Sequence, residues 1–179
     1  MSSPLPAVLA FSASDPTGGA GLQADLKTFA RHGVYGCAVV SLITVQNTRG
    51  VSRVVPLDAE LVGAQLDAVL EDVPPQAWKT GALGTRDIVE AVAIRAARLR
   101  STGSAQLVID PVMISKHGAS LIDEPARVAL VRLLLPHCAL VTPNLHEAAA
   151  LSGRVVESLA DAREAARAIA ALGPQAVLV

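Results

Sequence analysis

Long apolar runs are missing from this sequence, although about half of its 179 residues are apolar. No run approaches the roughly 20 uncharged residues that a membrane-spanning helix needs, so we expect a protein that does not cross a bilayer. Residues Met1 to Pro6 carry no basic group, and the apolar stretch Ala7 to Phe11 is too short for a signal peptide. These absences predict a cytoplasmic location.

An excess of charge is also absent, because 15 Lys and Arg residues face 16 Asp and Glu residues. The Arg residues are scattered, so no strong field would attract a polyanion, and nucleic acid is not an expected partner. Cysteine is scarce too: Cys37 and Cys138 each lie in an apolar run, without a second Cys or a metal-spaced His nearby. Buried reduced thiols are therefore favoured over a disulfide or a zinc site.

The sequence also lacks internal repeats, low-complexity tracts and any long linker. Residues 1–179 are therefore expected to form a single domain, and a chain of this length can bury about 70 % of its unfolded surface. What is present is an alternation of short β-branched runs with Ala-, Leu- and Arg-rich stretches of helical period. This alternation predicts an α/β domain in which a mostly parallel sheet has helices on both faces.

Most of the expected strands are continuously apolar, as strands covered on both faces must be. They are Ala7 to Phe11, Gly36 to Thr44, Ala77 to Thr80, Gln106 to Asp110, Ala139 to Thr142 and Ala176 to Val179, with Val51 to Val55 as a peripheral strand. Helices are expected at Gly21 to His32, Ala59 to Asp72, Arg86 to Arg100, Pro125 to Leu135, Leu145 to Leu151 and Leu159 to Leu172. Helix starts are indicated by Asp58, Thr85, Asn144, Ser158 with its capping-box partner Asp161, and Pro125.

A glycine-rich turn, Ser14 to Gly21, follows the first expected strand. Its glycines permit positive φ angles and the close approach of a ligand, and the helix that begins there points backbone N–H groups into the same space. A small polar ligand could bind here. A strand-to-helix turn uses glycine about as often merely to reverse direction.

Two common phosphate-binding motifs do not fit this turn. A Walker A loop ends in Gly-Lys-Ser/Thr, whereas Lys27 lies well inside the expected helix. Residues Gly19 to Ala24 match the dinucleotide-binding pattern with Ala in the last place. That motif needs an acid about 20 residues later, where this sequence has the amides Gln46 and Asn47. A Rossmann-type oxidoreductase is therefore a distant alternative.

A set of motifs in fixed order points to one family. They are Ser14 to Phe29, Gly33 to Cys37, Val45 to Thr48, Lys79 to Gly81, Asp87 to Ala91, Asp110 to Met113, Lys116 to Gly118, and Thr142 to Ala148. With these motifs, the sequence resembles bacterial hydroxymethylpyrimidine/phosphomethylpyrimidine kinases of the ribokinase-like superfamily over essentially its whole length. The resemblance implies a ribokinase-like three-layer α/β/α sandwich.

The resemblance also implies a pocket for an aminopyrimidine. Asp25 and Gln46 match the residues that hydrogen-bond the ring, and Ala13, Ala82 and Val112 match the rest of the pocket wall. A carboxylate and an amide suit an aminopyrimidine edge, which presents both donors and acceptors. Without the resemblance, Asp25 would be interpreted as a solvated acid of a first helical turn, and Gln46 as a turn residue. Many relatives carry Met where Ala82 stands, so the pyrimidine has less contact surface here.

A second group of residues resembles the family's nucleotide-phosphate site. Asp110 follows a strand, and Asn144 and Glu147 span the first turn of a helix, whose N-terminus attracts phosphate. The resemblance implies that Asp110 and Glu147 position Mg²⁺ beside ATP, largely through water, and that Lys116 lies in a mobile loop near the phosphates. Without the resemblance, Asn144 and Glu147 would be interpreted as a helix cap only.

The resemblance further implies a segment beyond Val179 that supplies the anion hole, the catalytic base and most of the adenine site. We therefore expect the chain to lack the C-terminal part of the fold, to contain no catalytic residue, and to be inactive alone. For the whole enzyme the resemblance implies ATP-dependent phosphorylation of 4-amino-5-hydroxymethyl-2-methylpyrimidine and of its monophosphate in thiamin synthesis, by a homodimer. The alternatives are a pyridoxal kinase of the same superfamily and a non-catalytic pyrimidine-binding fragment.

Overall fold

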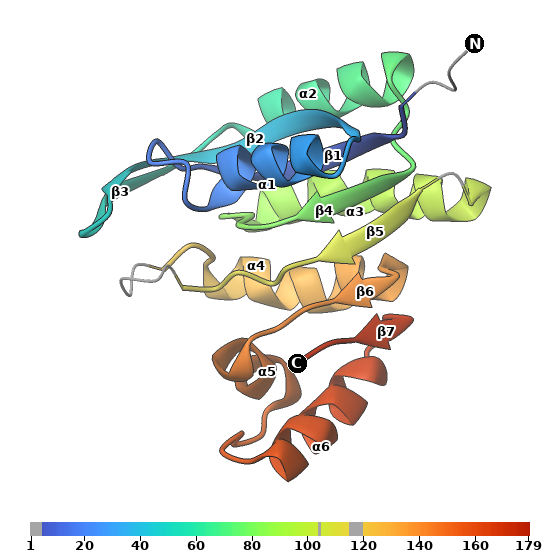
Figure 1. Ribbon diagram of the computed structural model, residues 1–179. Coiled ribbons are helices and arrows are strands. Elements are labelled where there is room, and N and C mark those ends of the chain that lie inside the picture. The colour runs from blue at the N-terminus through green and yellow to red at the C-terminus, as the bar shows by residue number, and fades with distance from the viewer. Residues whose placement is uncertain (1–4, 104, 115–119) are drawn as a thin grey trace.

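A single seven-stranded sheet organises the chain (Figure 1). The computed structural model describes residues 5–103, 105–114 and 120–179. The strand order is β3-β2-β1-β4-β5-β6-β7, and every neighbouring pair is parallel except β2 and β3, which are antiparallel. The strands are β1 (Ala7–Ser14), β2 (Tyr35–Asn47), β3 (Gly50–Pro56), β4 (Ala77–Thr80), β5 (Gln106–Ile109), β6 (Leu140–Val141) and β7 (Ala176–Val177).

Helices connect the parallel strands and cover both faces of the sheet. In Figure 1, α1 lies in front of β1 and β2, whereas α2, α3 and α4 lie behind the sheet. α5 and α6 pack against each other, and α6 also contacts β7. The helices are α1 (Gly21–Arg31), α2 (Ala59–Asp72), α3 (Arg86–Thr102), α4 (Glu124–Ala129), α5 (Leu145–Ser152) and α6 (Leu159–Ala170). The expected three-layer α/β/α arrangement is confirmed.

The strand order fixes where a ligand can bind. From β1 the chain crosses to β2 on one side, and it later returns to β4 on the other side of β1. Helices on either side of such a reversal diverge, which leaves a crevice at the carboxyl ends of the strands. The carboxyl ends of β1 and β4 therefore mark the expected position of the site.

The helix starts agree with the sequence analysis. The side chains of Asp58, Thr85 and Ser158 accept backbone N–H groups at the starts of α2, α3 and α6, and Asp161 completes a capping box with Ser158. The proline at position 125 lies in the first turn of α4. The expected continuous helix Pro125 to Leu135 is wrong in its second half. A π-helical segment (Leu130–Leu134) and a 3₁₀ turn (Leu135–His137) follow α4, because Pro136 has no N–H to continue an α-helix.

The core lies mainly between the sheet and the helices behind it. Its largest buried side chains include Trp78 of β4 and Phe11 of β1. A smaller apolar cluster of Ala13, Leu42, Ala82 and Leu121 lies on its own, near the carboxyl ends of the strands. Three residues of this second cluster, Ala13, Ala82 and Leu121, form an apolar wall for the site described below.

Both cysteines are free, as expected, but only Cys138 is fully buried, while Cys37 is half-buried. Burial raises the pKa of the Cys138 thiol to about 11, so this thiol is unreactive at neutral pH. Within the described ranges, no helix has the length and apolarity that crossing a bilayer requires.

Candidate functional site

A cavity of about 400 Å³ opens at the carboxyl ends of β1, β2, β4 and β5. This volume suits a small organic ligand, since binding pockets typically measure about 300–1,000 Å³. Its wall combines apolar side chains with polar groups from the glycine-rich turn, from the end of β2 and from the ends of β4 and β5. The polar and charged side chains among them are Ser12, Asp15, Thr17, Thr44, Gln46, Asn47, Thr48, Lys79 and Asp110.

Four of the five residues expected to bind the pyrimidine line this cavity. Gln46 lies at the end of β2, and the apolar residues Ala13, Ala82 and Val112 also contribute to the wall. Asp25 is not among the lining residues. It lies on α1, and its carboxylate contacts Lys79, which does line the cavity. The structure thus places Asp25 and Gln46 on the same side of the molecule, with Asp25 one layer behind the wall.

The glycine-rich turn wraps around the carboxylate of Asp15. Oδ1 of Asp15 accepts the backbone N–H of Thr17 at 2.8 Å, and Oδ2 accepts those of Gly19 at 3.1 Å and Ala20 at 2.9 Å. The Thr17 hydroxyl donates to both oxygens at 2.9 Å. The N–H groups of the turn itself therefore bind an internal acid, and they hold the turn in place as part of the cavity wall.

Asp15 remains ionised although it is only 3 % exposed. Burial by itself would raise the pKa of this carboxyl. Hydrogen bonds from the Gln46 side chain, from Thr17 and from the Ala20 N–H outweigh burial and lower the pKa from 3.8 to about 2. A negative charge is therefore fixed beneath the turn and next to Gln46.

Side chains of α1 hold the turn from the other side. Gln23 accepts the Asp15 N–H at 2.8 Å and donates to the Ser14 hydroxyl at 2.8 Å, while Lys27 donates to the Gly18 carbonyl at 2.8 Å. The motif Ser14 to Phe29 thus has a structural explanation: its polar residues bind one another and keep the turn in one conformation.

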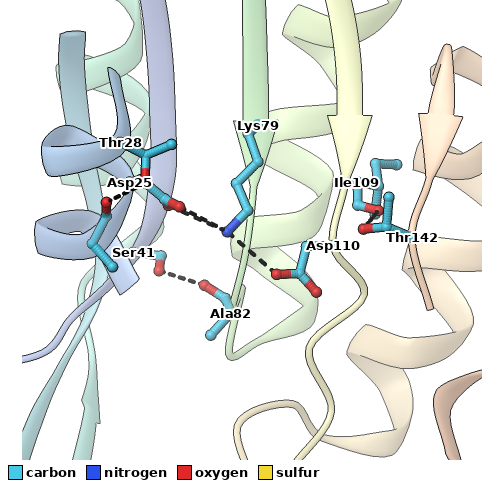
Figure 2. A network of polar contacts seen from close by, with 9 residues as sticks. Asp25, Thr28, Ser41, Lys79, Ala82, Ile109, Asp110 and Thr142 are labelled. Atoms are coloured by element: carbon cyan, nitrogen blue, oxygen red, sulfur yellow. Dashed lines mark hydrogen bonds and ion pairs between the residues drawn. The ribbon is translucent and has the colours of Figure 1, made fainter. Parts of the chain in front are cut away.

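A line of three charged groups crosses the site (Figure 2). The Lys79 ammonium lies between two carboxylates, at 3.2 Å from Oδ2 of Asp25 and 3.3 Å from Oδ2 of Asp110. Lys79 is the penultimate residue of β4, Asp25 lies on α1, and Asp110 directly follows β5. The ammonium therefore joins the pyrimidine side of the expected site to its nucleotide side.

Asp110 lies in the cavity wall, as its position after a strand predicted. Burial raises the pKa of the Asp110 carboxyl, the Lys79 charge opposes this rise, and the Asp25 charge adds to it. A cation close to Asp110 favours the charged form of its carboxyl. This arrangement agrees with the expected role near Mg²⁺ without testing it.

Asn144 and Glu147 lie at the start of α5, where they form a capping box. The Asn144 side chain accepts the Glu147 N–H at 2.9 Å, and Glu147 Oε2 accepts the Asn144 N–H at 2.9 Å. Glu147 is only 5 % exposed, and burial raises its pKa, with a further rise from the charge of Asp110. Asn144 and Glu147 therefore do cap α5, and the Glu147 carboxylate also lies close enough to Asp110 for their charges to interact.

These groups are compatible with Mg²⁺ held mainly by water. Mg²⁺ keeps several water ligands and takes one or two protein carboxylates, which matches a pair such as Asp110 and Glu147. Over the ranges that the structure covers, no group of three or more His, Cys, Asp or Glu side chains is placed to hold a metal directly. Lys116, expected near the phosphates, lies outside the described residues.

Sequence reasoning missed three features of the site. Asp15 was noted only as part of the turn, and Lys79 only as part of a motif. Gly81 was noted in the same motif, and its role is steric: a Cβ atom there would lie 2.2 Å from the Ser12 hydroxyl. The signal for Lys79 was available, because a lysine in an otherwise apolar buried strand needs a partner acid.

Comparisons with known proteins identify the family to which this chain is similar. The sequence matches the family model described as phosphomethylpyrimidine kinase over residues 15–179. A hydroxymethylpyrimidine/phosphomethylpyrimidine kinase from Synechococcus elongatus is 49 % identical over 98 % of this chain and 65 % of its own length. This chain spans less than two thirds of the length of such curated relatives.

Solved structures of two kinases also superpose on this chain. A phosphomethylpyrimidine kinase from Clostridium difficile superposes with a TM-score of 0.85 at 38 % identity, covering 96 % of this chain and 73 % of that one. A pyridoxal kinase from Staphylococcus aureus, solved with AMP-PCP and pyridoxal, gives a TM-score of 0.82 at 36 % identity, covering 98 % of this chain and 62 % of that one.

Proposed function

The chain belongs to the phosphomethylpyrimidine kinase family, and from this membership we propose that its cavity binds 4-amino-5-hydroxymethyl-2-methylpyrimidine and its monophosphate. As part of the whole enzyme, the chain would hold these acceptors while ATP phosphorylates them in thiamin synthesis. The observation that carries the proposal is the cavity itself, with the Gln46 amide, the Lys79 ammonium and an apolar wall around one small volume. The homodimer and the cytoplasmic location expected from the sequence remain predictions.

The site divides into an acceptor side and a nucleotide side. On the acceptor side, the Gln46 amide would pair with the ring edge, while Ala13, Ala82 and Val112 contact its faces. On the nucleotide side, the phosphates of ATP would lie near the start of α5, where helix N–H groups favour negative charge. Mg²⁺ would neutralise phosphate charge there, close to Asp110 and Glu147.

Binding of the pyrimidine alcohol to this chain tests the proposal. We expect calorimetric titration to detect binding, and Gln46→Leu to weaken it about 10- to 100-fold, because a polar ring edge then lacks its partner. Gln106→Leu, which changes an exposed amide at the start of β5 that does not line the cavity, serves as the control and should leave the affinity unchanged. Absence of binding to the unaltered chain would reject the proposal.

A pyridoxal kinase is the second candidate, because the Staphylococcus aureus structure above contains pyridoxal and covers nearly this whole chain. Pyridoxal presents a phenolic oxygen and an aldehyde where the pyrimidine presents an amino group. Competition between the two ligands for the cavity distinguishes the candidates. We expect the aminopyrimidine to displace pyridoxal, and the opposite order would favour the second candidate.

The proposed metal role of Glu147 predicts a separation of stability from metal binding. Glu147→Gln keeps the capping box, since Gln also accepts the Asn144 N–H, and it removes a buried negative charge beside Asp110. We expect an unchanged or higher melting temperature, with affinity for Mn²⁺, a spectroscopic substitute for Mg²⁺, reduced about 10- to 100-fold. Electron paramagnetic resonance measures the bound Mn²⁺.

Glu157→Gln is the matched control for this measurement, because Glu157 is an exposed acid just before α6. This variant should change neither the melting temperature nor the affinity for Mn²⁺. Equal Mn²⁺ affinity in the chain and in Glu147→Gln would contradict the proposed metal role. A lower melting temperature would contradict the view that the buried charge is not needed for folding.

A further inference from the structure

Lys79 has an unusual place in the charge pattern of the cavity. Among the described residues that line the cavity, it is the only cation, whereas Asp15 and Asp110 are acids of the same wall. Asp25 adds a third carboxylate directly behind Lys79. Without the Lys79 ammonium, the described charged groups at this wall would therefore all be negative.

This pattern matters differently for the two proposed acceptors. The pyrimidine alcohol is neutral, so it can enter an acidic cavity without electrostatic cost. Its monophosphate carries roughly −1.5 to −2 charges at neutral pH, as phosphate monoesters do. Like charges a few Å apart repel strongly inside a protein, so the wall needs a positive group where the phosphate lies.

The geometry of Lys79 suits that task. Its contacts with Asp25 and Asp110 measure 3.2–3.3 Å, longer than the 2.7–2.9 Å that is usual for charge-assisted hydrogen bonds. Its side chain keeps 25 % of its surface exposed, and Figure 2 shows the ammonium lying between the two carboxylates. An ammonium group has three donors on a flexible stem. It can therefore move toward a phosphate while the two acids keep it at the wall.

We propose that Lys79 is a specificity-determining residue that binds the phosphate of the monophosphorylated acceptor, with Asp25 acting as the residue that positions its ammonium. This inference rests on the proposed function and deepens it, because it separates the recognition of the second acceptor from that of the first. The Gln46 amide recognises the ring, which both acceptors share. Lys79 recognises the group in which they differ.

Calorimetric titration of the chain with the pyrimidine alcohol and with its monophosphate tests the inference. In Lys79→Gln, we expect affinity for the monophosphate to fall about 10- to 100-fold, the effect of losing a hydrogen bond to a charged group, while affinity for the alcohol changes less than about threefold. Lys79→Arg keeps the charge and should keep most of the preference. Arg163→Gln, which removes a positive charge from the exposed surface of α6, should leave both affinities unchanged.

Each outcome decides a different question. If neither ligand binds the unaltered chain, the proposed function and this inference both fail. If both bind and Lys79→Gln weakens them equally, or if the monophosphate does not bind, the inference about Lys79 fails while the proposed function stands for the alcohol. Circular dichroism shows whether Lys79→Gln folds.

If Lys79→Gln is unfolded, the unaltered protein with ¹⁵Nζ-labelled lysine replaces it. The monophosphate should then shift the Lys79 ammonium resonance, identified by its loss in Lys79→Arg, and the alcohol should not. Equal shifts with both ligands would overturn the inference.

Discussion

Gly21→Ala is expected to lower the free energy of unfolding by about 2–5 kcal/mol, because two separate costs coincide at this position. Gly21 has a φ of +57°, which costs an L-residue about 1–2 kcal/mol. A Cβ atom there would also lie 2.3 Å from the Ala13 carbonyl oxygen, a backbone atom that cannot move without shifting β1. Gly21 and Ala13 both line the cavity, so pyrimidine affinity should fall as well.

Gly33→Ala provides a matched control at the other end of α1. Gly33 has a φ of +68°, but a Cβ atom there would meet no atom within 4 Å. Only the conformational cost applies, so the expected loss is about 1–2 kcal/mol. Urea denaturation monitored by circular dichroism measures both losses. Equal losses in the two variants would show that the contact with Ala13 relaxes at no cost.

Periodicity and capping residues predicted the fold well, because both are local properties of the chain. Asp58 and Ser158 mark their helices in the sequence as they do in the structure. The strand ends were less predictable. β2 continues to Asn47, past the expected end at Thr44, because β3 pairs with it there and lets polar residues such as Gln46 extend the strand. Such an extension depends on a partner strand, which apolar periodicity does not reveal.

Site residues that belong to a sequence motif could be predicted. Contacts between side chains that are far apart in the sequence could not. Resemblance pointed to Gln46, and the structure places this amide in the cavity wall. Asp25 was expected to hydrogen-bond the pyrimidine, whereas its carboxylate contacts Lys79, which lies 54 positions away in the sequence. Neither residue shows this pairing in its local sequence, because it arises only when α1 packs against β1, whose neighbour in the sheet is β4.

The ionised state of Asp15 leads to the second large expected effect. Asp15→Asn keeps the size of the side chain but removes the charge that accepts the hydrogen bonds of the turn. A pKa lowered from 3.8 to about 2 corresponds to about 2 kcal/mol of stability at pH 7. We therefore expect the variant to be less stable than the unaltered chain by about this amount.

The stability difference between the unaltered chain and Asp15→Asn should also depend on pH, in a direction that the lowered pKa sets. Because the pKa of Asp15 is lower in the folded chain, its ionisation stabilises the fold fully above about pH 4 and loses this effect as the pH falls toward 2. The difference in unfolding free energy between the unaltered chain and Asp15→Asn should then shrink to about half at pH 3. Urea denaturation between pH 3 and 7 measures this difference.

Asp58→Asn is the control, because Asn caps α2 as well as Asp does, and it should cost less than about 0.5 kcal/mol at pH 7. A difference for Asp15→Asn that stays constant over this range would mean that packing, rather than the charge, makes Asp15 necessary to the turn.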